Sequence, residues 1–188
     1  EKISLSNRIN SELETMSKTI YNYWFVQFDF PNEEGKPYKT SGGEMEYNEE
    51  LKRKIPKDWE VKSISEIEDN IVTGKTPSTE VEEYYDGAIP FITIPDIREN
   101  IFIVSTEKTL SEIGANTQPK KYLPADSICV SCIASPGLVG FVTKPSQTNQ
   151  QINSVICKNE FNRYFLYFAI KHFFEFSFGA KIGNTFVN

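Results

Sequence analysis

The first element that the hydrophobic pattern predicts is a helix over residues 3–24. Apolar residues recur at intervals of four and three positions, and the positions between them are mostly polar. This spacing is the heptad repeat of a coiled coil, in which the apolar stripe packs against a second helix. A helix of this length is marginal on its own, so the stripe needs either a partner helix or its own domain to pack against. The stripe consists of Ile9, Leu13, Met16, Ile20 and Tyr23.

The pattern changes after this helix. Residues 31–56 are rich in Pro, Gly and charged side chains, which is typical of a linker or an extended arm. Short apolar runs separated by turn signals follow from about Trp59 onward. We therefore expect three parts: the end of a helix in residues 1–24, a linker or arm over 25–58, and a compact domain over 59–188.

Four apolar runs in the compact domain predict β-strands, because each is short and bounded by turn residues. Ser-Pro-Gly at 135–137 predicts a tight turn between the second and third of them. Residues 161–176 are apolar nearly all round, which predicts a buried helix. The chain as a whole is expected to be α+β: a coiled-coil-type helix, then a mixed α/β domain with a twisted, largely antiparallel sheet. The predicted strands are 89–94, 127–133, 138–143 and 152–156.

Composition fits a globular protein that forms a core, with 39% hydrophobic and 24% charged residues. No apolar run is long enough to span a membrane, and the first ten residues lack the apolar segment of a secretory signal. The chain has 3 cysteines without the spacing of a disulfide framework, which fits a reducing compartment. We therefore expect a cytoplasmic protein without a membrane partner.

Charge is distributed unevenly along the chain, whose net charge is -6. Residues 59–113 hold 12 acidic and 4 basic side chains, a net of -8, whereas residues 114–188 hold 3 acidic and 7 basic ones, a net of +4. An anionic partner is therefore expected to meet the later segment.

Gly74-Lys75-Thr76 matches the end of a phosphate-binding P-loop, G-x-x-x-x-G-K-[ST]. The first glycine of that motif would stand at position 69, which is Asp69 here, and a carboxylate there would repel phosphate. The three residues are therefore interpreted as a turn. A small nucleotide-binding enzyme is kept as an alternative that rests only on this half motif.

The other catalytic and metal motifs fail by spacing. Cys129 and Cys132 fall within a predicted strand, where positions three apart face opposite ways, and Cys157 stands alone. His172 is the only histidine, and no nucleophile is near it in the sequence. We expect no catalytic residue, no metal site and no cofactor of the chain's own.

A cluster of amide side chains lies between two predicted strands. Asn149, Gln150 and Gln151 belong to it, and Asn and Gln form paired hydrogen bonds with adenine N6 and N7 in the major groove. Lysines flank the cluster in the sequence and could contact phosphates. An ordinary polar loop is the alternative. The flanking lysines are Lys120, Lys121, Lys144, Lys158 and Lys181.

Several long segments, in the same order, resemble the DNA-specificity subunit of type I restriction-modification systems. Together they cover most of residues 5–156, which makes the resemblance far more specific than a three-residue motif. The segments are SELETMSKTIYNYWFVQFDFPNEEGKPYKTSGG, EELKRKIPKDWEV, GKTPST, GAIPFITIPDI, GANTQPKKYLPADSICVSCIASPGLVG and PSQTNQQIN.

The resemblance implies a non-catalytic subunit with target-recognition domains separated by conserved helices. The helices set the distance between two half-sites and dock methyltransferase subunits, through which a restriction and motor subunit joins. S-adenosylmethionine, ATP and Mg would belong to those partners. In this chain, one conserved helix ends near residue 24 and one recognition domain follows, C-terminally truncated because the next conserved helix is missing. The helix stripe of Ile9, Leu13, Met16 and Ile20 would bind a partner helix or a second copy of the chain.

We expect the domain to bind double-stranded DNA and to recognise one half of a bipartite site. The alternative is an interaction module that recruits proteins through its helix and no longer recognises DNA. The residues predicted to contact bases are Ser131, Ser135, Asn149, Gln150 and Gln151. Those predicted to contact the DNA backbone are Lys75, Thr76, Lys181, Asn184 and Thr185.

Overall fold

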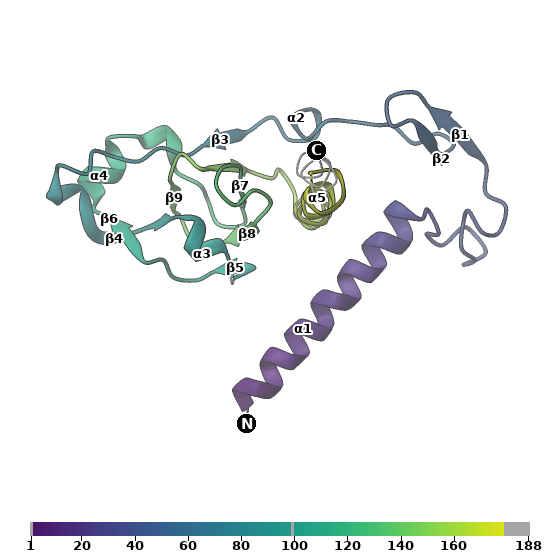
Figure 1. Cartoon of the computed structure of the whole chain (residues 1–188), viewed down its shortest axis with the longest axis horizontal. Helices are drawn as coiled ribbons and strands as arrows, with labels where there is room; N and C mark the ends of the chain where they lie inside the picture. The colour runs from purple at the N-terminus through teal and green to yellow at the C-terminus, as the bar shows by residue number, and fades with distance from the viewer. Residues whose placement is uncertain (1, 99, 179–188) are drawn as a thin grey trace, which may run out of the picture. The chain divides into compact units, whose positions relative to one another are not determined.

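The structure is a computed structural model, and it describes residues 2–98 and 100–178. The contacts within the chain divide it into two compact units, residues 1–62 and 63–188. Figure 1 labels the elements of both units.

The first unit begins with the long helix α1, Lys2–Tyr21, which continues as the π-helical turn η1, Asn22–Val26. The helix predicted from the heptad pattern is thus confirmed. None of the residues of α1 is buried, and the stripe residues from Ile9 to Ile20 remain between 48% and 59% exposed. The apolar seam of this helix is therefore available to a partner.

An aromatic cluster organises the chain after η1. The ring of Phe30 stacks between those of Tyr38 and Trp59, with centroid distances of 4.7 and 5.2 Å. The buried carboxylate of Asp29 accepts hydrogen bonds from the amide and the hydroxyl of Thr40, at 2.8 and 2.7 Å. These contacts fold residues 28–43 into a compact loop around Trp59.

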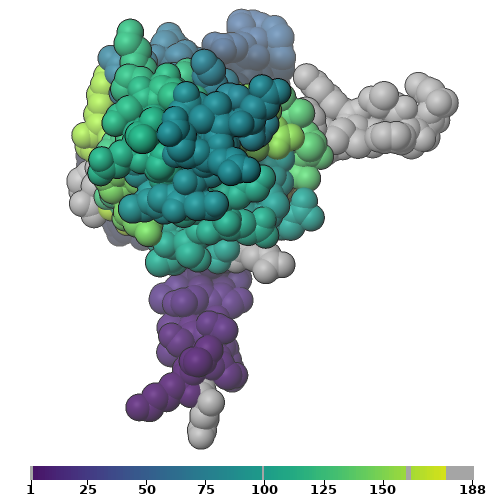
Figure 2. All heavy atoms as spheres, turned by 90° about the vertical axis from the view of Figure 1, so that its left-hand side faces the viewer, coloured from purple at the N-terminus to yellow at the C-terminus, as the bar shows by residue number. Residues whose placement is uncertain are grey.

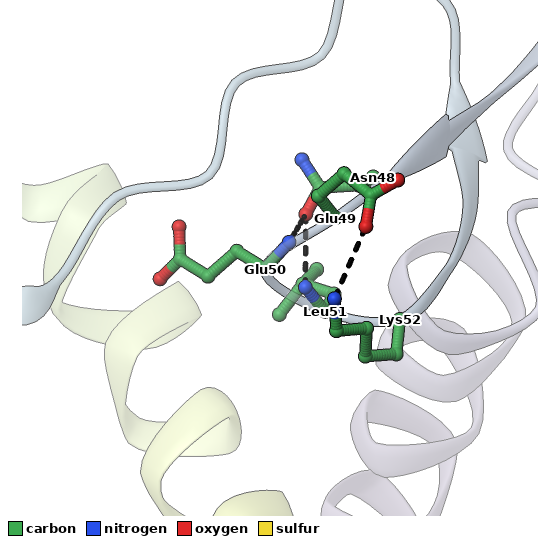
Figure 3. Close-up of polar contacts among 5 residues, drawn as sticks. All are labelled: Asn48, Glu49, Glu50, Leu51 and Lys52. Carbon is green, nitrogen blue, oxygen red and sulfur yellow. Dashed lines mark hydrogen bonds and ion pairs between the residues drawn. The ribbon is translucent and has the colours of Figure 1, made fainter.

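A hairpin of β1, Met45–Asn48, and β2, Arg53–Pro56, follows the loop. Asn48 shapes its turn, because its side-chain oxygen accepts the backbone amides of Glu50 and Leu51 at 3.1 and 2.9 Å (Figure 3). Glu49 and Lys52 form an ion pair of 3.1 Å across the same turn. The stretch predicted as a linker or arm thus contains a hairpin and an aromatic cluster, which its high content of charge and turn residues concealed.

The second unit contains two sheets. The five-stranded sheet has the order β3-β10-β7-β8-β5, and the three-stranded sheet has the order β6-β4-β9. Only the pairs β5–β8 and β4–β9 are parallel, so the largely antiparallel α+β fold expected from the sequence is confirmed. The first sheet comprises β3 Ile71–Thr73, β10 Ile152–Val155, β7 Ile128–Ser131, β8 Val139–Val142 and β5 Phe102–Ile103; the second comprises β6 Lys108–Leu110, β4 Tyr85–Ile92 and β9 Gln147–Thr148.

Seven helical segments surround these sheets in the part of the unit that the structure describes. Short helices connect strands, and the longest helix precedes the end of the described chain. They are α2 Ile64–Ile67, η2 Glu82–Tyr84, α3 Ile94–Arg98, α4 Glu112–Asn116, η3 Pro119–Lys121, α5 Glu160–His172 and η4 Phe173–Phe178.

Both faces of the three central strands β10, β7 and β8 are buried, which explains why these strands are continuous apolar runs. Along β7, Ile128 and Val130 pack in one core cluster with Leu166 and Ile170 of α5, whereas Cys129 packs in the other cluster. Neighbouring side chains of β7 thus point to opposite faces of the sheet, as predicted. Cys129 is buried in the core, and this burial raises the pKa of its thiol to about 12. Such a thiol is structural rather than reactive.

Two predicted elements differ from the structure. The strand predicted over 89–94 ends at Ile92, because the carboxylate of Asp96 accepts the amide and the hydroxyl of Thr93, each at 2.7 Å, and thereby starts α3. The helix predicted over 161–176 is buried on one face only. Leu166 and Ile170 are buried, but Tyr164, Phe165 and Phe173 are exposed.

The acidic segment of the chain supplies the surface around η2 and α4. Glu82, Glu83 and Glu112 are exposed there, and the Ser111 hydroxyl ties the two elements together by donating to the carbonyl of Glu83. Figure 2 shows the side of the second unit on which these elements lie. Over residues 2–98 and 100–178, no helix combines the length and the apolar character needed to cross a membrane.

Candidate nucleic-acid interface

The polar loops singled out in the sequence lie at one end of the five-stranded sheet. β10 is antiparallel to both β3 and β7, β7 is antiparallel to β8, and β8 is parallel to β5. The ends of β3 and β7 therefore lie beside the beginnings of β10, β8 and β5. We call this edge the loop end; its segments are residues 74–77, 100–101, 132–138 and 149–151.

The second sheet reaches the same place. β4 and β9 are parallel, with Ile92 paired to Thr148, and the amide of Asn149 donates to the carbonyl of Ile92 at 3.2 Å. The chain after β4 therefore also emerges at the loop end, where it forms α3. Segments as far apart in the sequence as 74–77 and 149–151 are thus assembled at one end of the sheet.

The Gly74 turn packs directly on the amide loop. The backbone amides of Gly74 and Lys75 donate to the carbonyls of Ile152 and Thr148, at 3.0 and 2.9 Å. A Cβ atom on Gly74 would lie 2.1 Å from the carbonyl oxygen of Asn149, so only glycine permits this approach. Because both amides are already bonded, they cannot surround a phosphate as a P-loop does. These contacts leave the nucleotide-binding alternative without support.

Two of the three amide side chains are bonded to each other. Asn149 Nδ2 donates to Gln151 Oε1, and the Gln151 backbone amide donates to Asn149 Oδ1, both at 3.1 Å. Gln150 lies between them and is exposed, and its Oε1 accepts a hydrogen bond of 2.5 Å from the hydroxyl of Thr76. The structure thus brings the predicted residues Thr76, Asn149, Gln150 and Gln151 together.

Two buried glutamines, Gln118 and Gln147, hold the Gly74 turn in place by hydrogen bonds. Gln118 Nε2 donates to the Lys75 carbonyl at 2.7 Å and to Gln147 Oε1 at 2.8 Å. Gln147 is fully buried, and its own Nε2 donates to the Ala115 carbonyl at 2.9 Å. Neither residue could be singled out from the sequence, in which both look like ordinary polar residues.

The hairpin turn between β7 and β8 contributes differently from what the sequence suggested. Ser131 is fully buried; its hydroxyl donates to the Ser135 carbonyl at 2.5 Å and accepts the Leu138 amide at 3.0 Å. As placed, Ser131 shapes the turn and does not face solvent. Ser135 is half-buried, and its hydroxyl lies 3.4 Å from Arg98 Nη2.

Arg98 is a candidate that the sequence analysis missed. It is exposed at the end of α3, beside the hairpin turn, and adds a positive charge to the loop end. Glu107 supplies a negative charge nearby, since its backbone amide donates to the Asp96 carboxylate. The one sequence signal for Arg98 was that it is the sole basic residue between Lys75 and Lys108, in an otherwise acidic stretch.

Two of the flanking lysines do not surround the amide loop, contrary to the expectation from sequence order. Lys144 and Lys158 follow the final residues of β8 and β10, which places them at the opposite end of the sheet. Lys158 also forms an ion pair of 3.1 Å with Asp69 there. Sequence proximity was misleading because each strand carries the chain across the sheet.

Lys75 is exposed, and Lys120 and Lys121 lie on η3 directly after Gln118. Lys181, Asn184 and Thr185 lie outside the described residues. Among residues 2–98 and 100–178, no group of three His, Cys, Asp or Glu side chains could hold a metal ion.

The chain is similar to known proteins over most of its length. A family model described as the type I restriction modification DNA specificity domain matches residues 56–187. The HindI type I restriction enzyme specificity subunit of Haemophilus influenzae is 36% identical over 217 aligned positions, covering 91% of this chain and 47% of that protein. The MjaIX specificity subunit of Methanocaldococcus jannaschii is 35% identical over 130 positions, covering 68% and 30%.

A solved structure shares the fold. The HsdS subunit from Thermoanaerobacter tengcongensis superposes with a TM-score of 0.55 at 14% identity, covering 92% of this chain and 37% of that one. At this identity the likeness concerns architecture alone: a long helix followed by a mixed α/β domain. The chain spans about half the length, or less, of the proteins that it matches.

Proposed function

Because the chain belongs to the type I restriction-modification DNA specificity family, we propose that its second unit binds double-stranded DNA and recognises one half of a bipartite site. The observation that carries this proposal is the gathering of four loop segments, with the polar residues of the Gly74 turn and the amide loop among them, at the loop end of the sheet. In this layout residues 1–24 end a conserved helix, 25–58 connect it, and 59–188 form the recognition domain.

The chemistry of the loop end suits a duplex. Lys75 and Arg98 provide positive charges that phosphates attract, and the amide loop and the turn at Ser135 provide neutral hydrogen-bonding groups. Direct contacts to base edges come from such neutral groups and from arginine. Gln151 and Ser135, both half-buried at this surface, are the proposed base contacts.

The first unit is proposed to dock methyltransferase subunits through the exposed stripe of α1, or to pair with a second copy of the chain. The subunit itself is non-catalytic in this proposal. S-adenosylmethionine, ATP and Mg would act in its partners, including the restriction and motor subunit that joins through the methyltransferase. This assembly would operate in the cytoplasm.

The charge at the loop end can be tested with a pair of lysines. Lys75→Ala is expected to weaken DNA binding for all sequences and to reduce the slope of log affinity against log salt by about one, because one phosphate contact is lost. Lys144→Ala removes the same charge at the opposite end of the sheet and should leave both quantities unchanged. The measurement is DNA binding by the complete specificity subunit assembled with its methyltransferase subunits, at several salt concentrations. Equal effects of the two variants would contradict the proposed orientation.

Base recognition is tested separately at Gln151. Gln151→Ala should lower discrimination at one base pair of the target by roughly 1–3 kcal/mol and leave the other positions unchanged. The same complex is measured with its target and with every single-base-pair variant. If the unaltered complex distinguishes no target from other DNA, the recognition proposal is wrong, and a protein-interaction module becomes the better description.

A further inference from the structure

We propose that Gln150 donates a hydrogen bond to a DNA phosphate, and that Thr76 is the positioning residue that turns the Gln150 amide group toward the DNA. The inference rests on the proposed function and deepens it. It assigns Gln150 to the sugar-phosphate backbone, whereas the sequence alone suggested a base edge.

The hydrogen bond between the two side chains determines which atoms of Gln150 face outward. Thr76 Oγ1 donates to Gln150 Oε1 at 2.5 Å, so the carboxamide oxygen is directed to the 74–77 turn. Gln150 is exposed, and Nε2 has no hydrogen-bond partner among the residues that the structure describes. The side chain therefore directs its NH2 group, which can only donate, away from the turn, and one of the two lone pairs of Oε1 is already occupied.

A group that offers mainly a donor fits a phosphate better than an adenine. The paired contact with adenine needs a carboxamide oxygen and nitrogen side by side on the base edge, to accept from N6 and donate to N7. With its oxygen held toward the 74–77 turn by Thr76, Gln150 offers a base only the remaining lone pair of that oxygen, whereas its nitrogen is unencumbered. Phosphate oxygens only accept hydrogen bonds, and exposed Lys75, next to Thr76 in the chain, places a cation at the same turn.

Both sides of the Thr76–Gln150 bond are fixed by other elements. The carbonyl of Lys75 accepts from Gln118 Nε2 at 2.7 Å, and the carbonyl of Pro77 accepts from the Tyr85 hydroxyl at 2.9 Å. On the other side, the Asn149 carbonyl accepts the Ile152 amide at 3.2 Å and closes the amide loop. A group held in this way loses little conformational freedom on binding, as suits a contact that sets the register on the duplex.

Thr76 acts through Gln150 rather than on the DNA. Its hydroxyl has one proton, which it donates to Gln150, and a phosphate has no proton to offer in return. Thr76 therefore cannot bond a phosphate while it holds Gln150. This changes the direct backbone contact predicted for Thr76 into an indirect one.

The test compares Gln150→Ala, Thr76→Val and Thr76→Ser in the complete specificity subunit assembled with its methyltransferase subunits. Binding is measured to the target, to each single-base-pair variant and to unrelated DNA, at several salt concentrations. Gln150→Ala and Thr76→Val should each weaken binding about ten-fold for all of these DNAs, the size expected of a hydrogen bond to a charged group. The salt slope should stay unchanged, because neither side chain carries a charge.

Two comparisons separate positioning from a general structural defect. Thr76→Ser keeps the hydroxyl and should bind as the unaltered protein does, whereas Thr76→Val combined with Gln150→Ala should bind no more weakly than Gln150→Ala alone. The contacted phosphate is located with duplexes that carry a single neutral methylphosphonate. At that phosphate, and only there, the effect of Gln150→Ala should disappear.

Three results would overturn the inference. Loss of discrimination at one base pair in Gln150→Ala would identify a base contact instead, including one to guanine O6 and N7 or thymine O4. Unchanged binding by Gln150→Ala would contradict the phosphate contact, and unchanged binding by Thr76→Val would contradict the positioning role. In either case the proposed function stands if the unaltered complex still selects its target. Failure of the unaltered complex to select any DNA would instead refute the proposed function and the inference with it.

Discussion

Replacing Leu13 and Met16 of α1 with glutamate is expected to abolish the association of this chain with methyltransferase subunits, and any dimer of the chain itself. The two side chains are 55% and 59% exposed and lie on one stripe of the helix. The double substitution removes roughly 4 kcal/mol of the free energy gained when these two apolar side chains are buried on docking, which corresponds to about 1,000-fold weaker association. Burying two charges adds a further cost. Co-purification and sedimentation of the full chain with its partner subunits measure the effect.

The matched control places the same charges on the opposite face of α1. Asn7→Glu combined with Ser11→Glu also adds two carboxylates, but at positions outside the heptad stripe. This variant should associate normally, and urea unfolding of the second unit should be the same in both variants. If the Leu13 and Met16 variant still docks or dimerises as the unaltered chain does, the stripe is not the association surface.

Gly74→Ala is expected to destabilise the second unit by about 3 kcal/mol, at the upper end of the usual cost of overpacking. The added Cβ atom would lie 2.1 Å from the Asn149 carbonyl oxygen and 2.3 Å from the Thr148 hydroxyl oxygen. The nearest of these is a backbone atom in a hydrogen-bonded loop, so it cannot move aside cheaply. The free energy of unfolding of the full chain in urea provides the measurement, and DNA binding by the assembled complex should fall as the turn separates from the amide loop.

Gly140→Ala is the comparison for this prediction. It makes the same substitution in the same unit, but its Cβ atom would come no closer than 3.1 Å to a neighbour, the Asn100 carbonyl oxygen. A small adjustment relieves that contact, so we expect a cost of about 1 kcal/mol or less. A Gly74→Ala variant as stable as Gly140→Ala would show that the turn and the amide loop are not tightly packed.

The sequence by itself determined the elements whose cause is local. The heptad spacing of Ile9 to Tyr23 predicted α1, and the apolar runs predicted the four central strands, because side-chain periodicity reflects which faces of a helix or strand are buried. The long ordered motifs identified the family, and the failure of the P-loop at Asp69 was visible from spacing alone. These conclusions needed no knowledge of which strand lies beside which.

Only the tertiary structure decided which of the polar residues share a surface. Strand order and direction depend on contacts between distant segments, and they bring Thr76 to Gln150 and Arg98 to Ser135 while they carry Lys144 and Lys158 to the other end of the sheet. Very short strands such as β3 and β5 have too few residues to show a period, so the sequence could not predict the edges of the sheet. The burial of Ser131 and the need for glycine at position 74 likewise follow from packing against residues far along the chain, which local pattern does not encode.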